Sequence, residues 1–217
     1  MSFMPETSTG GPDARFHSTH WTVVCQAKDG SREALDELLG GYWKPVYFFV
    51  RRRGHDVESA KDLTQSFIAK LMERRFLERV SPELGRFRSF LLTSLARFLG
   101  DERDRAGAIK RGGGFDFVRA ESELASTDPS PERAFHRAWA REVVHRALKR
   151  LGTNLPPGDL ALLGGAAPAD LTVQQRKSRA RRLRDRLRDC LRAELLPTVH
   201  TLDQADSEIR DLLSALG

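Results

Sequence analysis

The chain has 217 residues, of which 40% are hydrophobic and 30% charged, with a formal net charge of +6 and a pI near 9.7. This length allows one or two domains with real cores, and the basic balance favours an anionic partner. The longest apolar run, residues 46–50, is too short to cross a bilayer, and the first residues lack the pattern of a signal peptide. Cys25 and Cys190 form no pairing motif, which predicts a reduced cytoplasmic protein without disulfides.

The N-terminal residues 1–17 are rich in Ser, Thr, Gly and Pro, which predicts a disordered tail. A first short helix is expected over 21–27, and a second begins at a Ser31 cap. Pro45 is expected to interrupt or kink this second helix. Residues 55–80 form a third helical segment with one apolar side.

The stretch 85–111 combines an apolar stripe at helical spacing with a series of arginines. Aromatic rings among arginines suit single-stranded nucleic acid, because guanidinium groups follow phosphates while ring faces stack on bases, at about 1–3 kcal/mol per base. The alternative is an amphipathic helix with core phenylalanines and a solvated basic face. Taken alone, the stretch favours this alternative.

The second half of the chain starts after a break in composition. Residues 112–130 hold three glycines followed by acidic and small residues, which predicts a flexible linker containing a domain boundary. Pro131 suits a first helical position behind a Ser130 cap, and the apolar stripe that follows extends to Leu151.

Beyond this helix, residues 153–170 are rich in glycine and proline, and at best 159–163 form one helical turn. A basic helix is expected over 172–196, with leucines every four residues along one face and nine basic against two acidic residues between Arg176 and Arg192. A last short helix is expected over 206–216.

The order of these features resembles that of bacterial extracytoplasmic-function (ECF) RNA polymerase sigma factors. Residues 87–91, FRSFL, followed by D-E-R at 101–103 and A-I-K-R-G-G-G at 108–114, resemble the family's promoter-melting, −10-reading segment. The string D-L-T-Q-S-F at 62–67 resembles the family's D-L-T-Q-E-F docking surface for the polymerase clamp helices. The likeness extends from about residue 19 to residue 216, and the order of the motifs is more specific than any one of them.

The resemblance implies a first set of functional residues in the N-terminal half. Contact with core RNA polymerase is assigned to Asp62, Leu63, Gln65 and Phe67. The −10 DNA-binding residues are Arg86, Phe87, Arg88, Ser89, Phe90, Arg97, Arg103, Arg105, Lys110 and Arg111.

The docking string departs from the family pattern, because Lys61 and Ser66 stand where acidic residues are usual. We hypothesise that phosphorylation of Ser59, Thr64 or Ser66 restores the negative charge, since a phosphate adds roughly −1.5 to −2 at neutral pH. A Ser/Thr kinase is therefore one expected partner class.

The C-terminal half resembles the family's region four in part. P-E-R-x-F-x-R-x-W-A from residue 131 resembles its opening helix, and the basic helix resembles its recognition helix, but the Y-x-E-[IL]-A helix in front is missing. The resemblance implies −35 DNA-binding residues of two kinds. Bases would be contacted by Gln174, Gln175, Arg176 and Lys177, and mostly phosphates by Arg179, Arg181 and Arg182. The alternative is a solvated basic helix packed through its leucines on the helix of Trp139.

These features predict an all-α protein of two helical domains, a region-two-like domain over 18–111 and a reduced, helix-turn-helix-like region-four domain over 131–217. The resemblance implies a cytoplasmic ECF-type sigma factor that is not an enzyme and uses no cofactor or metal. Its implied partners are core RNA polymerase and promoter DNA, with an anti-sigma factor or a kinase in addition and no membrane. Two alternatives stay open: a degenerate sigma-like regulator that does not initiate transcription, and a helical adaptor held by a partner protein.

Overall fold

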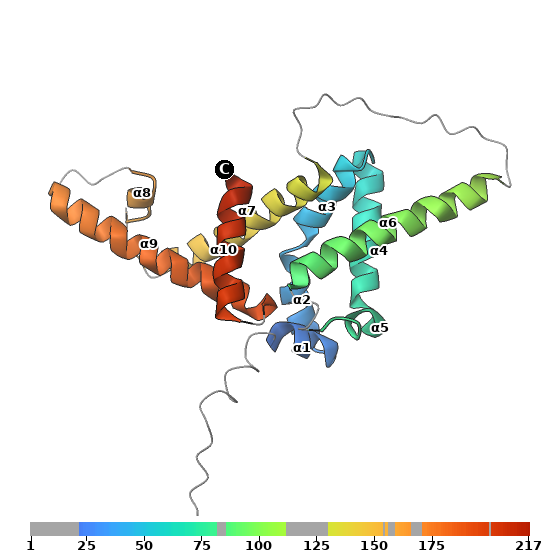
Figure 1. Cartoon of the computed structure of the whole chain (residues 1–217), viewed down its shortest axis with the longest axis horizontal. Helices are drawn as coiled ribbons and strands as arrows, with labels where there is room; N and C mark the ends of the chain where they lie inside the picture. The colour runs from blue at the N-terminus through green and yellow to red at the C-terminus, as the bar shows by residue number, and fades with distance from the viewer. Residues whose placement is uncertain are drawn as a thin grey trace, which may run out of the picture.

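The computed structural model describes residues 22–81, 86–111, 130–153, 155, 159–165, 171–199 and 201–217. Within these ranges every regular element is a helix, which confirms the predicted all-α class (Figure 1). None of the described helices has the length and apolar content needed to span a bilayer. The predicted tail at 1–17 and most of the predicted linker at 112–130 lie outside the described residues.

Six helices form the first half of the chain, each close to its expected position. They are α1 (Thr22–Lys28), α2 (Arg32–Gly40), α3 (Trp43–Arg52), α4 (Val57–Met72), α5 (Arg74–Leu77) and α6 (Phe87–Arg111). The Ser31 hydroxyl accepts a hydrogen bond from the Ala34 amide at 3.2 Å, and this caps α2 as predicted.

Two boundaries differ from the prediction. The chain is interrupted near Pro45 as expected, but the break lies at Gly41 and Tyr42, so Pro45 is the third residue of α3. A first-turn amide has no partner within its helix, and a proline there removes no hydrogen bond. The single segment expected over 55–80 is two helices, since Glu73 is extended and separates α4 from α5.

The second half contains α7 (Pro131–Gly152), α8 (Asp159–Leu163), α9 (Val173–Leu195), the short 3-10 helix η3 (Leu196–Thr198) and α10 (Leu202–Leu216). The Ser130 side chain accepts a hydrogen bond from the Arg133 amide at 3.2 Å, as the predicted cap requires. α8 is the single helical turn expected at 159–163, and α10 begins four residues before the expected 206. Figure 1 shows α9 extending away from α1–α6, with α8 alongside its first half.

Buried side chains from both halves form one continuous cluster. Phe49 and Phe67 from the first half belong to the same cluster as Phe135, Trp139 and Leu212 from the second. Helix α7 provides the connection, because it packs against α3 on one side and against α9 and α10 on the other. The division into domains at 18–111 and 131–217 therefore stays a prediction, and in this structure the two segments share a core.

Helix α6 is amphipathic over its first half only. Phe87, Leu91, Leu95 and Phe98 are buried at four-, four- and three-residue steps, so one face packs on the core. The exposed residues 103–106 lie on the second half, which extends beyond the neighbouring helices in Figure 1.

Truncation of Phe135 tests whether the two segments fold as one unit. We expect Phe135→Ala to lower the free energy of unfolding by about 3–5 kcal/mol, because this fully buried ring leaves a cavity. The shared core predicts faster amide hydrogen exchange in α3 and α4 as well as in α7. Leu213→Ala, at a side chain 61% exposed, is the control and should change stability by less than about 0.5 kcal/mol. Unchanged exchange in α4 would instead indicate two independently folding domains.

Candidate nucleic-acid interface

The arginines at the start of α6 contact helix α10 rather than solvent. One guanidinium nitrogen of Arg88 lies 2.7 Å from Oε2 of Glu208 and 3.2 Å from Oδ2 of Asp211. Arg86 donates a hydrogen bond to the Ser207 hydroxyl at 2.7 Å and forms an ion pair with Asp211. We call these five residues the α6–α10 ion-pair cluster.

The Arg88–Glu208 pair is buried, with the side chains 7% and 2% exposed. Burial raises the pKa of Glu208, and the charges of Arg88 and Arg86 oppose this change. The Arg88 guanidinium also lies over the Trp139 ring, 4.2 Å from its centroid, while its Nε has no hydrogen-bond partner among the described residues. Removing either charge would leave the other buried and uncompensated, at a cost of about 3–5 kcal/mol.

His136 of α7 extends this cluster toward an open hollow. Its Nδ1 lies 2.7 Å from a guanidinium nitrogen of Arg88. Because arginine can only donate, His136 accepts through Nδ1 and its ring is neutral. Burial, followed by the charge of Arg88, lowers the pKa of His136 to about 4. The hollow beside it, of about 460 Å³, is also lined by Arg133 and Arg137.

The two phenylalanines predicted to hold −10 bases are placed differently. Phe87 is fully buried, with its ring edge-on to Tyr42 at a centroid distance of 5.5 Å. Phe90 is half-buried between Phe76, at 5.6 Å, and Phe87, at 6.3 Å. In this conformation Phe87 is a core residue and cannot stack on a base. For Phe87 the −10 prediction is therefore wrong, and the alternative of an amphipathic helix with core phenylalanines holds.

Of the remaining −10 candidates with described side chains, Ser89 lines the hollow beside Arg88 and Asp211, whereas Arg97, Arg103 and Arg105 lie farther along α6. Ser89, Arg97 and Arg103 are exposed along α6, and Arg105 pairs with Glu102 on its own helix. The side chains of the last two candidates, Lys110 and Arg111, lie outside the described part of the chain.

Helix α4 presents part of the predicted polymerase-docking string. Asp62 and Gln65 are exposed and Leu63 is half-buried. Phe67 is fully buried and its ring packs against Phe98 at 5.4 Å, so it positions the helix and cannot itself contact a partner.

The three proposed phosphorylation sites on α4 also differ in accessibility. Thr64 is fully buried and its hydroxyl donates to the Ala60 carbonyl at 2.7 Å, which excludes it from modification in the folded protein. Ser59 is half-buried and donates to Asp56 at 2.7 Å, whereas Ser66 is exposed. Of the three, Ser66 is the accessible candidate.

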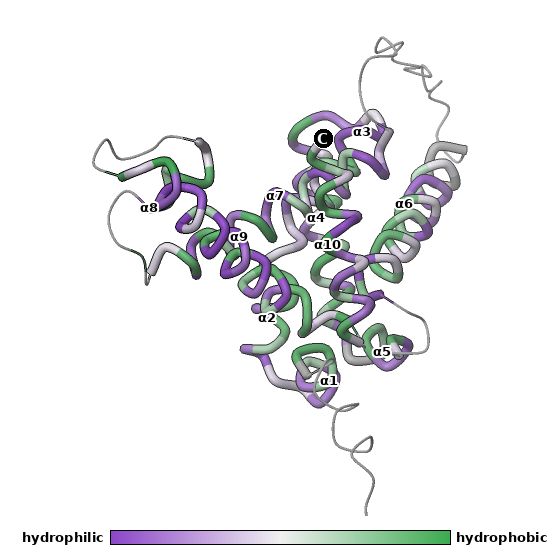
Figure 2. Tube along the Cα trace, turned by 60° about the vertical axis from the view of Figure 1, so that its left-hand side comes forward, coloured by the Kyte–Doolittle hydropathy of each residue, from purple (hydrophilic) through white to green (hydrophobic). Residues whose placement is uncertain are grey.

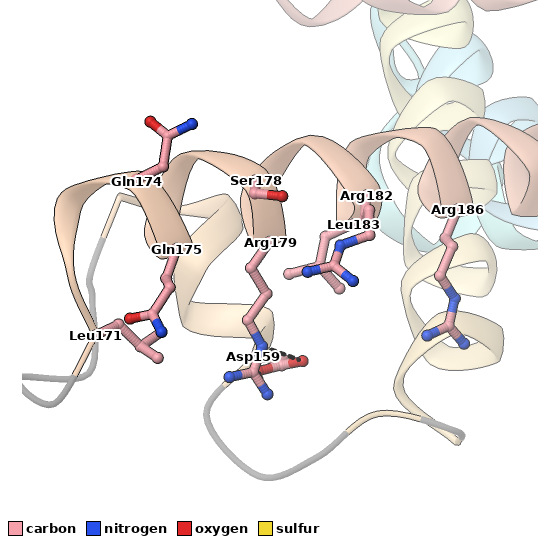
Figure 3. Close-up of a pocket in the computed structure, with 9 residues that line it drawn as sticks. All are labelled: Asp159, Leu171, Gln174, Gln175, Ser178, Arg179, Arg182, Leu183 and Arg186. Carbon is pink, nitrogen blue, oxygen red and sulfur yellow. Dashed lines mark hydrogen bonds and ion pairs between the residues drawn. The ribbon is translucent and has the colours of Figure 1, made fainter.

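The start of α9 uses several of the predicted −35 residues for its own structure (Figure 3). Gln175 and Thr172 form a capping box, in which the Gln175 side chain accepts from the Thr172 amide at 2.9 Å. Arg176 donates to the Leu171 carbonyl at 2.8 Å, and Arg179 pairs with Asp159 of α8 at 2.9 Å. These contacts fix the first turns of α9 against α8.

The other −35 candidates are available to solvent. Gln174, Lys177, Arg181 and Arg182 are all exposed. Figure 3 shows Gln174 on the opposite side of α9 from Arg179, pointing away from α8. The candidates therefore occupy two sides of the helix, and the side that faces away from α8 is the freer one.

Structure and spacing together reveal a stripe of cations that extends past the predicted set. Lys177, Arg181, Arg184 and Arg188 follow one another at four-, three- and four-residue steps and are all exposed. Within the described ranges, none of these four forms an ion pair. They extend over about 16 Å of helix at 1.5 Å per residue. We call them the α9 cation stripe; Figure 2 shows α9 as hydrophilic along most of its length.

The −35 residues predicted from the sequence end at Arg182 and do not include Arg184 and Arg188, although both lie at helical spacing from Lys177.

The part of the chain that the structure describes contains no group of His, Cys, Asp and Glu placed to hold a metal ion. Both cysteines are free.

Comparison of the chain with family models, with curated proteins and with solved structures finds no match. The resemblance to ECF sigma factors thus depends on the order of the short motifs alone. The function has to be inferred from the surfaces described above.

The pH dependence of stability tests the Arg88–His136 contact. Because the pKa of His136 is lower in the folded chain than its ordinary 6.5, its contribution to stability is present above about pH 6.5 and is lost as pH falls toward about 4. We expect this loss to be about 1–2 kcal/mol, after allowance for solvent screening at a partly exposed ring.

His136→Gln keeps an acceptor for Arg88 but does not titrate, so the urea midpoint of this variant should fall less steeply between pH 6.5 and 4. His145→Gln, at an exposed position on the same helix, is the matched control and should follow the parent. Parallel curves for parent and His136→Gln would contradict the assigned contact.

Proposed function

We propose that the chain is an ECF-type sigma factor that recruits RNA polymerase to promoter DNA and assists −10 melting. The observation that carries this proposal is the exposed α9 cation stripe, which forms no ion pair within the described residues and lies on a helix fixed at its start by α8. A cationic helix anchored at one end and extending from the core suits placement against a DNA duplex. The motif order of the sequence supplies the link to transcription.

Within this proposal α9 acts as the DNA-reading helix. Gln174 and Lys177, on its exposed first turns, would reach base edges, where amides and ammonium groups can tell bases apart. Arg181, Arg184 and Arg188 lie farther along the same side and would contact phosphates, which fixes register and adds affinity without sequence information.

The polymerase would dock on α4 through Asp62 and Gln65, which are exposed polar residues of the predicted string, as Ser66 is. The −10 strand would contact α6. In the present conformation Arg86 and Arg88 are engaged by α10, so −10 binding requires this helix to move away.

The salt dependence of duplex binding tests the role of α9. A protein making six phosphate contacts should show a slope of log affinity against log salt of roughly −5, at about −0.9 per contact. We expect the double variant Arg181→Ala/Arg184→Ala to reduce the magnitude of this slope by about 1.8.

Arg32→Ala/Arg79→Ala, which removes two exposed charges from α2 and from the segment after α5, is the matched control and should leave the slope within error. A flat salt response of the parent protein would favour the helical adaptor over any DNA-binding function.

One observation favours the degenerate regulator as a second candidate. Arg86, Phe87 and Arg88, which an initiating factor would offer to the melted strand, are occupied or buried by contacts with other helices. A regulator that binds polymerase or duplex DNA without melting it would have no need to release α10.

Neutralising the carboxylates of α10 separates the two candidates. Glu208→Gln/Asp211→Asn leaves two arginines without anions, so we expect faster amide exchange in α10 and, for an initiating factor, severalfold more run-off transcript with core polymerase. Asp36→Asn/Glu37→Gln, at two exposed carboxylates of α2, is the matched control and should match the parent. Full polymerase occupancy without transcript from either parent or variant would rule out the sigma factor and support the regulator.

A further inference from the structure

A groove between α3 and α7 is lined by none of the α4, α6 or α9 residues assigned above, and it shares Arg137 with the hollow beside His136. The two helices run antiparallel, since Lys44 pairs with Glu142 at 2.9 Å near one end and Arg53 with Glu132 at 3.5 Å near the other. Figures 1 and 2 both show them side by side. The hollow between them measures about 590 Å³, and we call it the α3–α7 groove.

Phe48 forms the aromatic wall of this groove. Its side chain is 46% exposed, although the core side of α3 is already supplied by buried Val46, Phe49 and Val50. The facing helix contributes Ala138, whose short side chain leaves space in front of the ring. The ring packs against Tyr47 at a centroid distance of 5.5 Å, and its exposed part is available to stack on a ligand.

Arginines surround the ring from both helices. Arg52 lines the groove from α3, and Arg137 and Arg141 line it from α7. Arg137 and Arg141 are exposed, and within the described residues neither has a carboxylate partner. The groove's one carboxylate in this part of the structure, Glu142, is paired with Lys44. The surface therefore suits a ligand that carries negative charge on both sides of a flat apolar group.

Single-stranded nucleic acid has this chemistry, because each base presents a π-face and lies between two phosphates. A duplex hides its base faces in the stack. An acidic partner helix would need apolar anchor pockets repeated at three- and four-residue steps, and the apolar lining of this groove in the described residues is the Phe48 ring and two small alanines, with the His145 imidazole beside them.

We propose that the α3–α7 groove binds single-stranded nucleic acid, with a base stacked on Phe48 and flanking phosphates held by Arg137 and Arg141. The site is separate from the α6 and α9 residues of the proposed function and does not depend on them. It adds a second place where an unpaired strand can be held while α6 is covered by α10.

The test uses the full chain and a fluorescent oligothymidylate of about fifteen nucleotides, a length within the range of known single-strand sites. We expect Phe48→Ala to weaken binding about 5- to 150-fold, the fold-change that corresponds to the loss of one base stack. Phe48→Trp should bind as the parent does or more tightly. Arg137→Ala/Arg141→Ala should reduce the slope of log affinity against log salt by about 1.4, at about 0.7 per phosphate on a single strand.

Photo-cross-linking with 4-thiothymine in the oligonucleotide then locates the strand. Cross-links in peptides from α3 or α7 support the site, and cross-links confined to α9 overturn it. The matched charge control, Arg184→Ala/Arg188→Ala, should leave the effect of Phe48→Ala and the α3–α7 cross-links in place while weakening duplex binding.

The outcomes separate this site from the proposed function. If groove variants leave oligothymidylate binding unchanged while α9 variants weaken duplex binding, the groove proposal is wrong and the DNA-binding proposal stands. Polyglutamate of matched charge can also be tested as a competitor of the fluorescent oligothymidylate. If it competes as well as unlabelled oligothymidylate, and Phe48→Ala changes the affinity for neither polymer, the groove is a docking surface for an acidic protein and the single-strand proposal fails.

Discussion

The buried ion pair between Arg88 and Glu208 is the interaction on which this arrangement of helices depends. It joins the start of α6 to α10, and the Trp139 ring of α7 covers the guanidinium at 4.2 Å from its centroid. A charge in such a place is tolerated only when an opposite charge and hydrogen bonds accompany it. Two residues that lie 120 positions apart thus help to fix α10. They act together with its buried Ile209 and Leu212 and with the ion pair between Asp206 and Arg192 of α9.

This pair also restricts what α6 can do. Arg88 is buried and its terminal nitrogens already contact Glu208, Asp211 and His136, so a phosphate can reach it only when these partners move. A strand bound at α6 must compete with α10, and it can shift the equilibrium only by its difference in affinity for the two arrangements.

Local features of the sequence predicted the helices, and non-local contacts explain what was missed. Ser31, Ser130 and Thr172 cap their helices through hydrogen bonds to residues three positions away, so the boundaries are visible in a short window. In the sequence Glu208 is one acidic residue of an amphipathic helix. Nothing near it in the sequence predicts that it pairs with Arg88. Phe87 and Phe90 belong to one motif, yet the packing of Tyr42 on Phe87 gives them different exposures, which spacing alone cannot distinguish.

The basic surfaces of the chain differ in whether an aromatic ring lies beside their cationic side chains, and this difference suits them to different ligands. The α9 cation stripe contains no ring, so it can follow phosphates but cannot hold an unpaired base. The α3–α7 groove adds an exposed ring to its arginines, which is the combination that single strands require. At the start of α6, Arg86 and Arg88 are already neutralised by carboxylates of α10. The described basic surfaces therefore comprise one suited to duplex, one suited to single strand, and one that is closed until α10 moves.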